Sequence, residues 1–170
     1  SAEAGGAVRL ADAEGAARAT LEAGAAGLPK LEMADAGAAV QVRLEVRENG
    51  TPSLSLWDAA SNTIRAWLDL SPDGSTQLGL YDTAGKLRAM TGIDTASIPF
   101  LKLLTADSKN RACLFAEEGG DVGLDFRDAE NRSVLALRTS SDMRPYLSMA
   151  DASFVSRVWL GVNSDDWTLL

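Results

Sequence analysis

Apolar and polar residues alternate along this chain in short runs, and the runs themselves recur. Seven apolar residues are spaced by 23 residues, with one step of 24, and a second apolar residue stands two positions after each of them. Apolar residues two apart are typical of a strand with one buried face, because successive side chains of a strand point to opposite sides. The seven starting residues are Val8, Leu31, Leu54, Leu78, Leu101, Leu124 and Leu147.

A second series with the same period-two pattern follows inside each repeat. Its members are Leu21, Leu44, Leu68, Thr91, Leu114, Leu137 and Leu160, and a residue such as Ala23, Val46 or Ile93 stands two positions later. Each repeat therefore contains two short strands, and we predict a meander of about fourteen strands that forms one domain over residues 1–170.

The residues between the strands favour tight hairpins. Asp occupies the same turn position in six repeats, at 12, 35, 58, 82, 128 and 151, and Gly or Asn often follows three residues later. The second connection contains Asn49-Gly50, Asp73-Gly74 and Gly119-Gly120. These residue types tolerate the positive φ that tight hairpins require, so we expect antiparallel strands. The single step of 24 predicts one extra loop residue between Ala59 and Thr63.

One repeat shows the consensus most clearly. Residues 78–89 read Leu-Gly-Leu-Tyr-Asp-Thr-Ala-Gly-Lys-Leu-Arg-Ala. This segment resembles the Leu-x-Leu-x-Asp-x-x-Gly-Lys-x-Arg-Ala repeats of bacterial surface proteins whose function is largely uncharacterised. The resemblance covers nearly the whole chain. It implies a repeat protein of the cell surface, and the coiled coils that often precede such repeats imply an oligomer.

The Leu-rich side of the strands cannot remain in water if the sheet is open and single-layered. It is covered by rolling the sheet into a barrel or roll, by stacking the repeats as a β-solenoid, or by the Leu sides of other chains. Hairpin turns favour antiparallel pairing over a solenoid. We therefore expect an all-β homotrimeric β-prism or fibre, in which three sheets turn their Leu sides toward a common axis.

The other side of the strands carries unusually large apolar residues in the middle repeats. They are Trp57, Trp67, Tyr81, Met90, Leu104, Cys113 and Phe115, and Trp159 follows in the last repeat. A band of such residues usually marks an interface. Three alternatives stay open: another subunit covers the band, a loop or terminus of the same chain folds over it, or the aromatic rings stack against sugars.

The two ends of the predicted sheet offer unpaired strands. Val8 and Leu10 belong to the first strand, and Leu169 and Leu170 lie where an eighth repeat begins. Open edges recruit further strands. We expect either end-to-end strand addition into filaments or a natural chain that continues beyond this point.

Composition limits the chemistry available to the chain. It contains no His, which removes the commonest general base and metal ligand, and we expect no catalytic site and no enzyme. The turn Asp residues recur in six repeats, so we interpret them as turn caps, with calcium binding at Asp-rich turns as the alternative cofactor. The candidate calcium loops are Gly119–Asp121 and Asn163–Asp166. Recurring Arg residues at 18, 65, 88, 111 and 157 are expected to face the turn Asp of the same hairpin.

Charge and termini indicate where the protein works. The net charge of −8 argues against nucleic acid and anionic membranes as partners, and no stretch approaches the roughly 20 apolar residues of a membrane span. The first residues are small and lack Met, as expected after removal of an export signal. We expect an extracellular or cell-surface structural and adhesive protein that assembles with itself. The alternative is a glycan-binding module that uses Trp57, Trp67 and Trp159.

Overall fold

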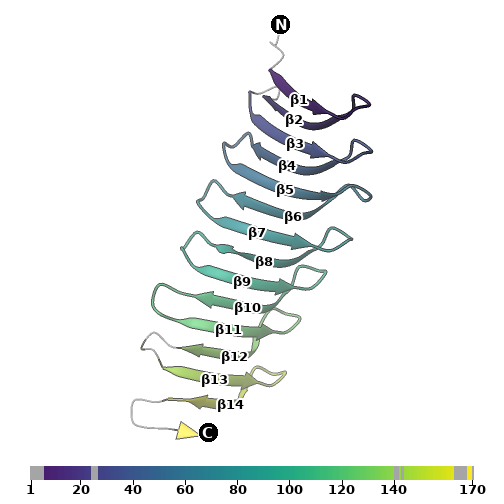
Figure 1. Cartoon of the computed structure of the whole chain (residues 1–170). Coiled ribbons are helices and arrows are strands. Elements are labelled where there is room, and N and C mark those ends of the chain that lie inside the picture. Colours follow the sequence, from purple (N-terminus) through teal and green to yellow (C-terminus); the bar gives the residue numbers. More distant parts are fainter. Residues whose placement is uncertain (1–5, 24–26, 140–141, 143, 163–167, 170) are drawn as a thin grey trace. The chain divides into compact units, whose positions relative to one another are not determined.

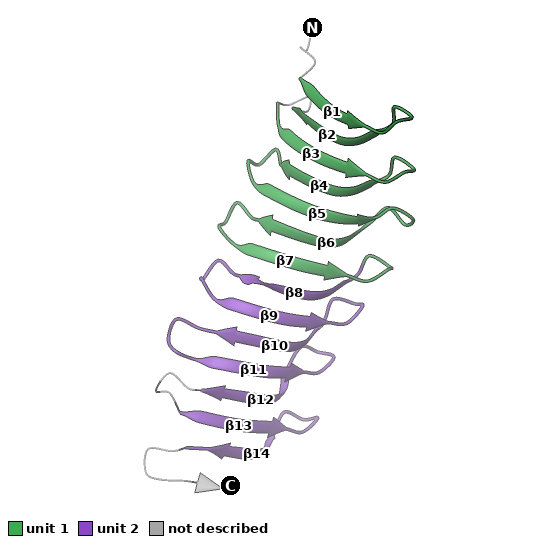
Figure 2. Ribbon diagram, in the orientation of Figure 1, with its two compact units in different colours: residues 1–85 green, residues 86–170 purple. Residues whose placement is uncertain are grey.

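The structure, a computed structural model, describes residues 6–23, 27–139, 142, 144–162 and 168–169. Strands and turns account for these residues, and none of them is helical. The chain divides into two compact units, Ser1–Gly85 and Lys86–Leu170 (Figure 2). The predicted all-β class is confirmed.

Unit 1 is an antiparallel meander in which each strand pairs with its neighbour in sequence (Figure 1). Its strands are β1 (Ala7–Ala11), β2 (Ala17–Ala23), β3 (Pro29–Ala34), β4 (Val40–Val46), β5 (Pro52–Asp58), β6 (Thr63–Leu70) and β7 (Thr76–Tyr81). Prolines stand at the first position of β3 and β5, where the missing N–H does least harm to the ladder.

Unit 2 repeats the same arrangement. Its strands are β8 (Leu87–Ile93), β9 (Pro99–Leu104), β10 (Asn110–Ala116), β11 (Val122–Arg127), β12 (Ser133–Thr139), β13 (Pro145–Ala150), β14 (Ser156–Gly161) and β15 (Thr168–Leu169). The antiparallel pairing differs from the parallel stacking of the solenoid alternative. The strands pair antiparallel because the connections between them are too short for the crossover that parallel strands need.

The turns explain why the chain reverses at fixed intervals. In the short connection of every repeat one residue has a positive φ, and these residues are Gly15, Ala38, Asn62, Gly85, Ser108, Asn131 and Phe154. The other connection of the repeat also contains a residue with positive φ, at Gly27, Gly50, Gly74, Ser97 and Gly120. A left-handed residue at the end of a three-residue loop matches the twist of a hairpin. The extra residue of the third repeat lies in the loop between Asp58 and Thr63, as predicted.

Strand register aligns the seven repeat starts with the second apolar series. In unit 1 the central column of paired residues is Val8, Leu21, Leu31, Leu44, Leu54, Leu68 and Leu78. In unit 2 it is Thr91, Leu101, Leu114, Leu124, Leu137, Leu147 and Leu160. Each unit thus presents an almost pure Leu ladder at the middle of its strands.

Candidate assembly surface

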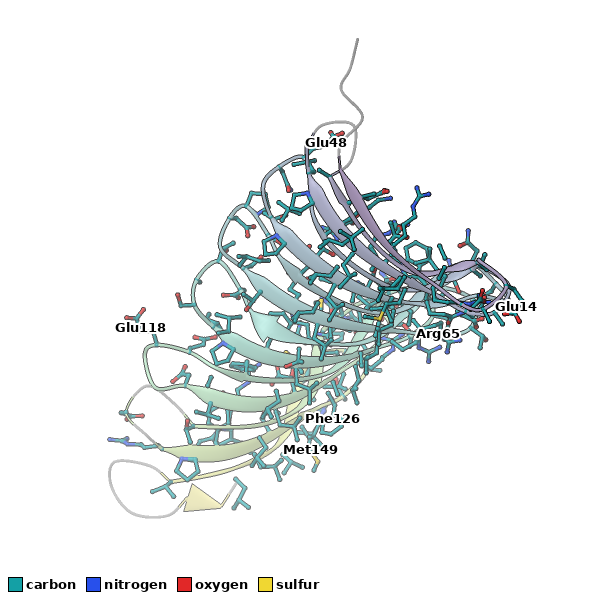
Figure 3. All side chains as sticks on the ribbon, turned by 45° about the horizontal axis from the view of Figure 1, so that its top comes forward. Glu14, Glu48, Arg65, Glu118, Phe126 and Met149 are labelled. Atoms are coloured by element: carbon teal, nitrogen blue, oxygen red, sulfur yellow. The ribbon has the colours of Figure 1, made fainter. Side chains whose placement is uncertain are left out.

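The Leu face is the side of each unit that carries the central column and the columns beside it. One neighbouring column is Leu10, Ala19, Met33, Val42, Leu56, Ala66 and Leu80 in unit 1, and Ala89, Leu103, Ala112, Phe126, Leu135, Met149 and Val158 in unit 2. Figure 3 labels Phe126 and Met149 from this column. The border positions carry residues such as Pro52, Leu70 and Thr76. No residue of the central column or of the neighbouring column is charged.

The Leu face is open to solvent in the single chain. In the central column, Leu68 is 50% exposed and Leu137 is 53% exposed. Among the described residues only Phe100, Cys113 and Ala136 form a buried hydrophobic core, and all three alternate with Leu-face residues and so point to the other side. Large exposed apolar surfaces mark interfaces. The single chain therefore lacks the core that normally stabilises a fold of this size.

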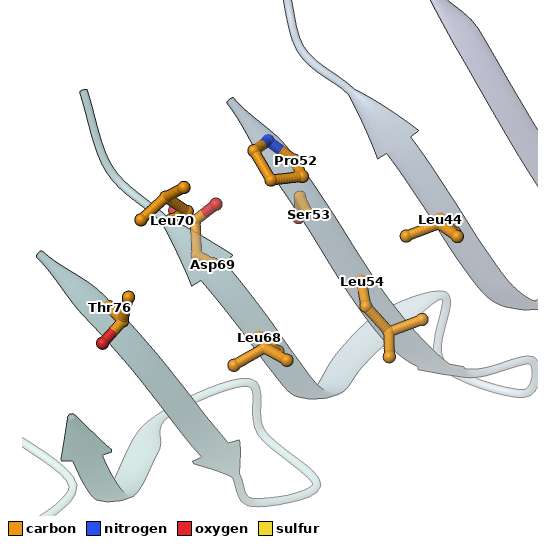
Figure 4. A pocket seen from close by; sticks show the side chains of 8 residues that line it. All are labelled: Leu44, Pro52, Ser53, Leu54, Leu68, Asp69, Leu70 and Thr76. Carbon is orange, nitrogen blue, oxygen red and sulfur yellow. The ribbon is translucent and has the colours of Figure 1, made fainter. Parts of the chain in front are cut away.

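Shallow hollows recur on the Leu face at equivalent positions of successive repeats. The hollow shown in Figure 4 is lined by Leu44, Pro52, Leu54, Leu68 and Leu70 and has a volume of about 250 Å³. A second hollow in unit 1, of about 300 Å³, lies one repeat earlier, around Leu21, Pro29, Leu31 and Leu44. A third, of about 340 Å³, lies in unit 2. Each hollow has an apolar lining, so a second apolar surface with the same repeat can fill it.

The opposite face of unit 1 is covered by its own charged side chains. Lys30 Nζ lies 2.9 Å from Glu22 Oε1, and Arg43 Nε donates to Glu32 Oε1 over 2.8 Å. The hydrogen bond that Lys30 donates to Glu22 raises the pKa of Lys30. These ion pairs join residues on adjacent strands, as cross-strand pairs on a solvated face do.

The opposite face of unit 2 has an acidic residue at its centre. Asp125 is fully buried and accepts hydrogen bonds from Arg138, whose Nε lies 2.7 Å from Asp125 Oδ1. The hydrogen bonds that Arg138 donates to Asp125 raise the pKa of Arg138. The guanidinium of Arg138 also lies 5.3 Å from the ring centre of Phe115.

The large apolar residues predicted as an interface or glycan platform each lie on the opposite face of their own unit. Trp57, Trp67, Tyr81, Met90, Leu104, Phe115 and Trp159 are half-buried, and Cys113 is buried. Trp57, Trp67 and Tyr81 gather on β5, β6 and β7 of unit 1. The Trp57 indole N–H donates to Ser55 Oγ over 2.8 Å, and the Trp67 indole N–H donates to the Tyr81 hydroxyl.

In the single chain the large apolar residues of the opposite faces are more covered than the Leu residues of the central columns. Aromatic side chains lie down on small neighbours: a Cβ at Gly123 would stand 2.6 Å from the Phe115 ring, and one at Gly161 would stand 2.6 Å from the Trp159 ring. The signal available in the sequence was the Gly and Ser residues beside these aromatics.

The turn Asp and the repeated Arg combine as predicted. Asp35 Oδ1 accepts main-chain hydrogen bonds from Gly37 at 2.9 Å and Ala39 at 3.0 Å. Arg65 reaches Asp58 Oδ2 at 3.3 Å, and its Nε donates to the main-chain oxygen of Tyr81 in the next repeat at 3.2 Å. Arg65 therefore ties one turn to the following one, and Arg18 does the same between Asp12 and Asp35.

Hydrogen bonds also set the acidity of the turn carboxyls. The main-chain N–H of Ala39 holds the pKa of Asp35 below its usual value, and that of Ala16 does the same for Asp12. At Asp151 the guanidinium of Arg157 is the main cause of the lowered pKa. Ionised carboxylates are therefore part of the turn structure.

The sequence predicts candidate calcium loops at Gly119–Asp121 and Asn163–Asp166. Within the described part of the chain, no three Asp, Glu or Cys side chains are grouped to hold a metal ion. At Gly119–Asp121 the main chain forms an ordinary hairpin turn, in which the Gly120 N–H donates to the Glu117 oxygen over 3.0 Å. Asn163–Asp166 lies outside the described residues.

The two end strands predicted from the sequence correspond to β1, which is described in full, and to β15, which includes Leu169, while Leu170 is not described. Val8 and Leu10 lie on β1 and are 63% and 66% exposed. Leu169 pairs with Leu160, one residue earlier than the Leu170 that the repeat spacing places there. Leu170 lies outside the described residues.

Comparison with protein-family models and with curated proteins finds no match to this chain. No helix long and apolar enough to span a membrane is present among the described residues.

Proposed function

We propose that this protein is a non-catalytic structural and adhesive protein whose chains assemble with one another through the Leu face. One observation carries the proposal: the Leu face carries no charge in its central and neighbouring columns and is about half exposed along both units, whereas hardly any apolar side chain of the described residues is buried elsewhere. Burial contributes about 25 cal/mol per Å² of apolar surface, so covering this face is the main source of stability open to the chain.

A trimer accounts best for the arrangement of columns on the Leu face. When three sheets surround one axis, the middle of every strand lies nearest the axis. There the side chains of the three copies meet in layers, and the space in each layer fits side chains of one size. The central column meets this need with Leu at almost every strand, while the columns beside it vary from Ala66 to Phe126. The proposed assembly is a homotrimeric β-prism, and a second copy of the chain is its own best partner.

Assembly end to end is the second level of this proposal. Among the described pairings β1 joins only β2, and β15 joins only β14. A free strand edge accepts another strand, so prisms can extend into a stalk or filament. The resemblance to bacterial surface repeats supports a location outside the cell. Electron microscopy at increasing protein concentration tests this step, because lengthening particles support it and particles of constant length oppose it.

The test of the Leu face is a pair of adjacent substitutions on β7. Leu78→Glu places a charge on the Leu face, and the matched variant Gln77→Glu places the same charge on the opposite face of the same strand. A buried unpaired charge is costly, so Leu78→Glu should reduce the mass in solution from trimer to monomer. Gln77→Glu should leave the trimer intact.

The same substitution in unit 2, Leu114→Glu, should have the same effect as Leu78→Glu. Light scattering or native mass spectrometry reads the mass, and circular dichroism reports whether the chain keeps its strands. A monomeric wild-type protein, or a Leu78→Glu variant that keeps the wild-type mass, contradicts the proposal.

The cluster of Trp57, Trp67 and Tyr81 favours a second candidate function, a glycan-binding module. Three aromatic rings on adjacent strands, with the guanidinium of Arg43 5.3 Å from the Trp57 ring centre, resemble a platform on which sugar rings stack. Trp67→Ala tests it on a glycan array, with Trp67→Phe, which keeps an aromatic ring on β6, as the control. Loss of a sugar signal in Trp67→Ala alone, with the oligomer intact, supports the platform.

A further inference from the structure

The central column of unit 2 does little to fix the register between neighbouring copies, that is, which strand of one copy lies opposite which strand of the next. Six of its seven residues are Leu, spaced by the same repeat. When one copy slides along another by a whole repeat, Leu still meets Leu at nearly every layer. A sheet whose pattern is uniform is prone to slip between registers.

Thr91 is the single exception in this column. It occupies the central position of β8, and register places it opposite Leu101 of β9. Its Oγ1 donates a hydrogen bond to the main-chain oxygen of Phe100 over 2.9 Å. This bond uses the hydroxyl hydrogen and leaves the lone pairs of the oxygen free to accept a hydrogen bond from another group. The side chain is exposed and lines the hollow of about 340 Å³ in unit 2.

The other Thr residues of the Leu face lie at strand ends. Thr139 accepts a hydrogen bond from the Val122 N–H at 3.0 Å and lies 3.2 Å from the Gly120 oxygen, so a turn occupies its hydroxyl. Thr76 begins β7 at the border of the face. Thr91 alone brings a hydroxyl to the middle of the strands, where copies of the chain come closest.

We infer that Thr91 sets the register in which copies of this chain pair, a step that rests on the proposed function. In the parallel, in-register assembly the Thr91 hydroxyls of all copies meet in one layer and share a polar environment with room for water. After a shift by one repeat, each hydroxyl is surrounded by Leu side chains. A single polar residue in an apolar seam selects register in this way at some cost in stability.

The experiment compares register in two backgrounds of the full chain, each carrying Cys113→Ser to remove the native thiol. In each background, chains with Leu114→Cys and chains with Leu137→Cys are mixed and refolded together. These positions lie in the central column two strands apart, about 9 to 10 Å along the stack, so a short bismaleimide joins 114 to 137 only after a slip of one repeat. Mass spectrometry of the digested, cross-linked protein counts the two kinds of link.

With Thr91 intact, like-with-like links (114 to 114 and 137 to 137) should account for at least nine-tenths of the total. Thr91→Val keeps the shape of the side chain and removes the hydroxyl, so 114-to-137 links should rise at least threefold. Thr91→Leu should raise them further. Adding Leu101→Thr to Thr91→Leu moves the polar layer by one strand and should restore like-with-like links.

Two outcomes overturn different claims. If Thr91→Val assembles and its share of 114-to-137 links equals that of the protein with Thr91, the role of Thr91 in register is wrong while the assembly proposal stands. If the chain remains monomeric and gives no cross-links between chains, the proposed function is wrong and the inference falls with it.

Discussion

Ionised carboxyls at the turns make the fold sensitive to acid. Hydrogen bonds from main-chain N–H groups hold the pKa values of Asp12, Asp35 and Asp58 below the usual value of 3.8. As pH falls, the unfolded chain therefore takes up protons before the folded one, and acid favours unfolding. The stability that these groups contribute is complete above the unfolded pKa and is lost as pH falls through the folded pKa values.

We expect the thermal midpoint to stay level between about pH 7 and pH 5 and to fall steadily below about pH 4. Circular dichroism melts at constant ionic strength measure the profile. Asp35→Asn removes one of the titrating groups and should make the acid limb shallower. A midpoint that stays constant down to about pH 2.5 would contradict this account.

Ala38 is strained by its position in the turn between β3 and β4. Its φ is +64°, a left-handed conformation that costs a residue with a Cβ roughly 1–2 kcal/mol. Ala38→Gly should therefore raise the free energy of unfolding by about 0.5–1 kcal/mol, after allowing for the greater freedom of Gly in the unfolded chain. Chemical denaturation measures the change. Ala36→Gly in the same turn relieves no such strain and should be neutral or destabilising.

At the scale of the strand, packing of aromatic rings onto glycines holds the opposite face of unit 2 together. A Cβ at Gly123 of β11 would stand 2.6 Å from the tip of the Phe115 ring on β10, so the ring has to leave its place over Gly123. We expect Gly123→Ala to lower the free energy of unfolding by about 1–3 kcal/mol, as overpacking does elsewhere.

Gly119→Ala is the matched control, because no atom lies within 4 Å of the added Cβ. Phe115→Ala in the Gly123→Ala background should recover part of the loss, since it removes the ring that clashes. Equal stabilities of the Gly123→Ala and Gly119→Ala proteins, measured by urea denaturation, would show that this packing does not matter.

Strands and turns were predictable from the sequence because their causes are local. A period of two residues defines each strand, and a residue such as Gly15 or Asn131 at a fixed offset defines each reversal. The exposure of each face was not predictable in the same way. It depends on how a side chain such as Trp159 fits onto Gly161 and onto the neighbouring strands. That fit follows from three-dimensional neighbours, which spacing along the chain does not report.

For the whole molecule, the open Leu face ties folding to assembly. Leu21, Leu44 and Leu160 are each about half exposed, at 51%, 47% and 46%, and in the proposed assembly other copies of the chain bury them. When the folded state contains several chains and the unfolded state contains one, stability depends on protein concentration. The protein is therefore expected to melt at a higher temperature when it is more concentrated, unlike a monomer.

The size of that dependence identifies the number of chains. A tenfold dilution should lower the free energy of unfolding by about 2.8 kcal/mol per mole of trimer, compared with about 1.4 kcal/mol per mole of dimer, because each additional released chain adds a factor of ten. Urea denaturation over a hundredfold range of concentration separates these values from zero. The Leu78→Glu variant should lose the dependence, whereas Gln77→Glu should retain it. A midpoint that is independent of concentration in the wild-type protein would mean that something other than a second copy covers the Leu face.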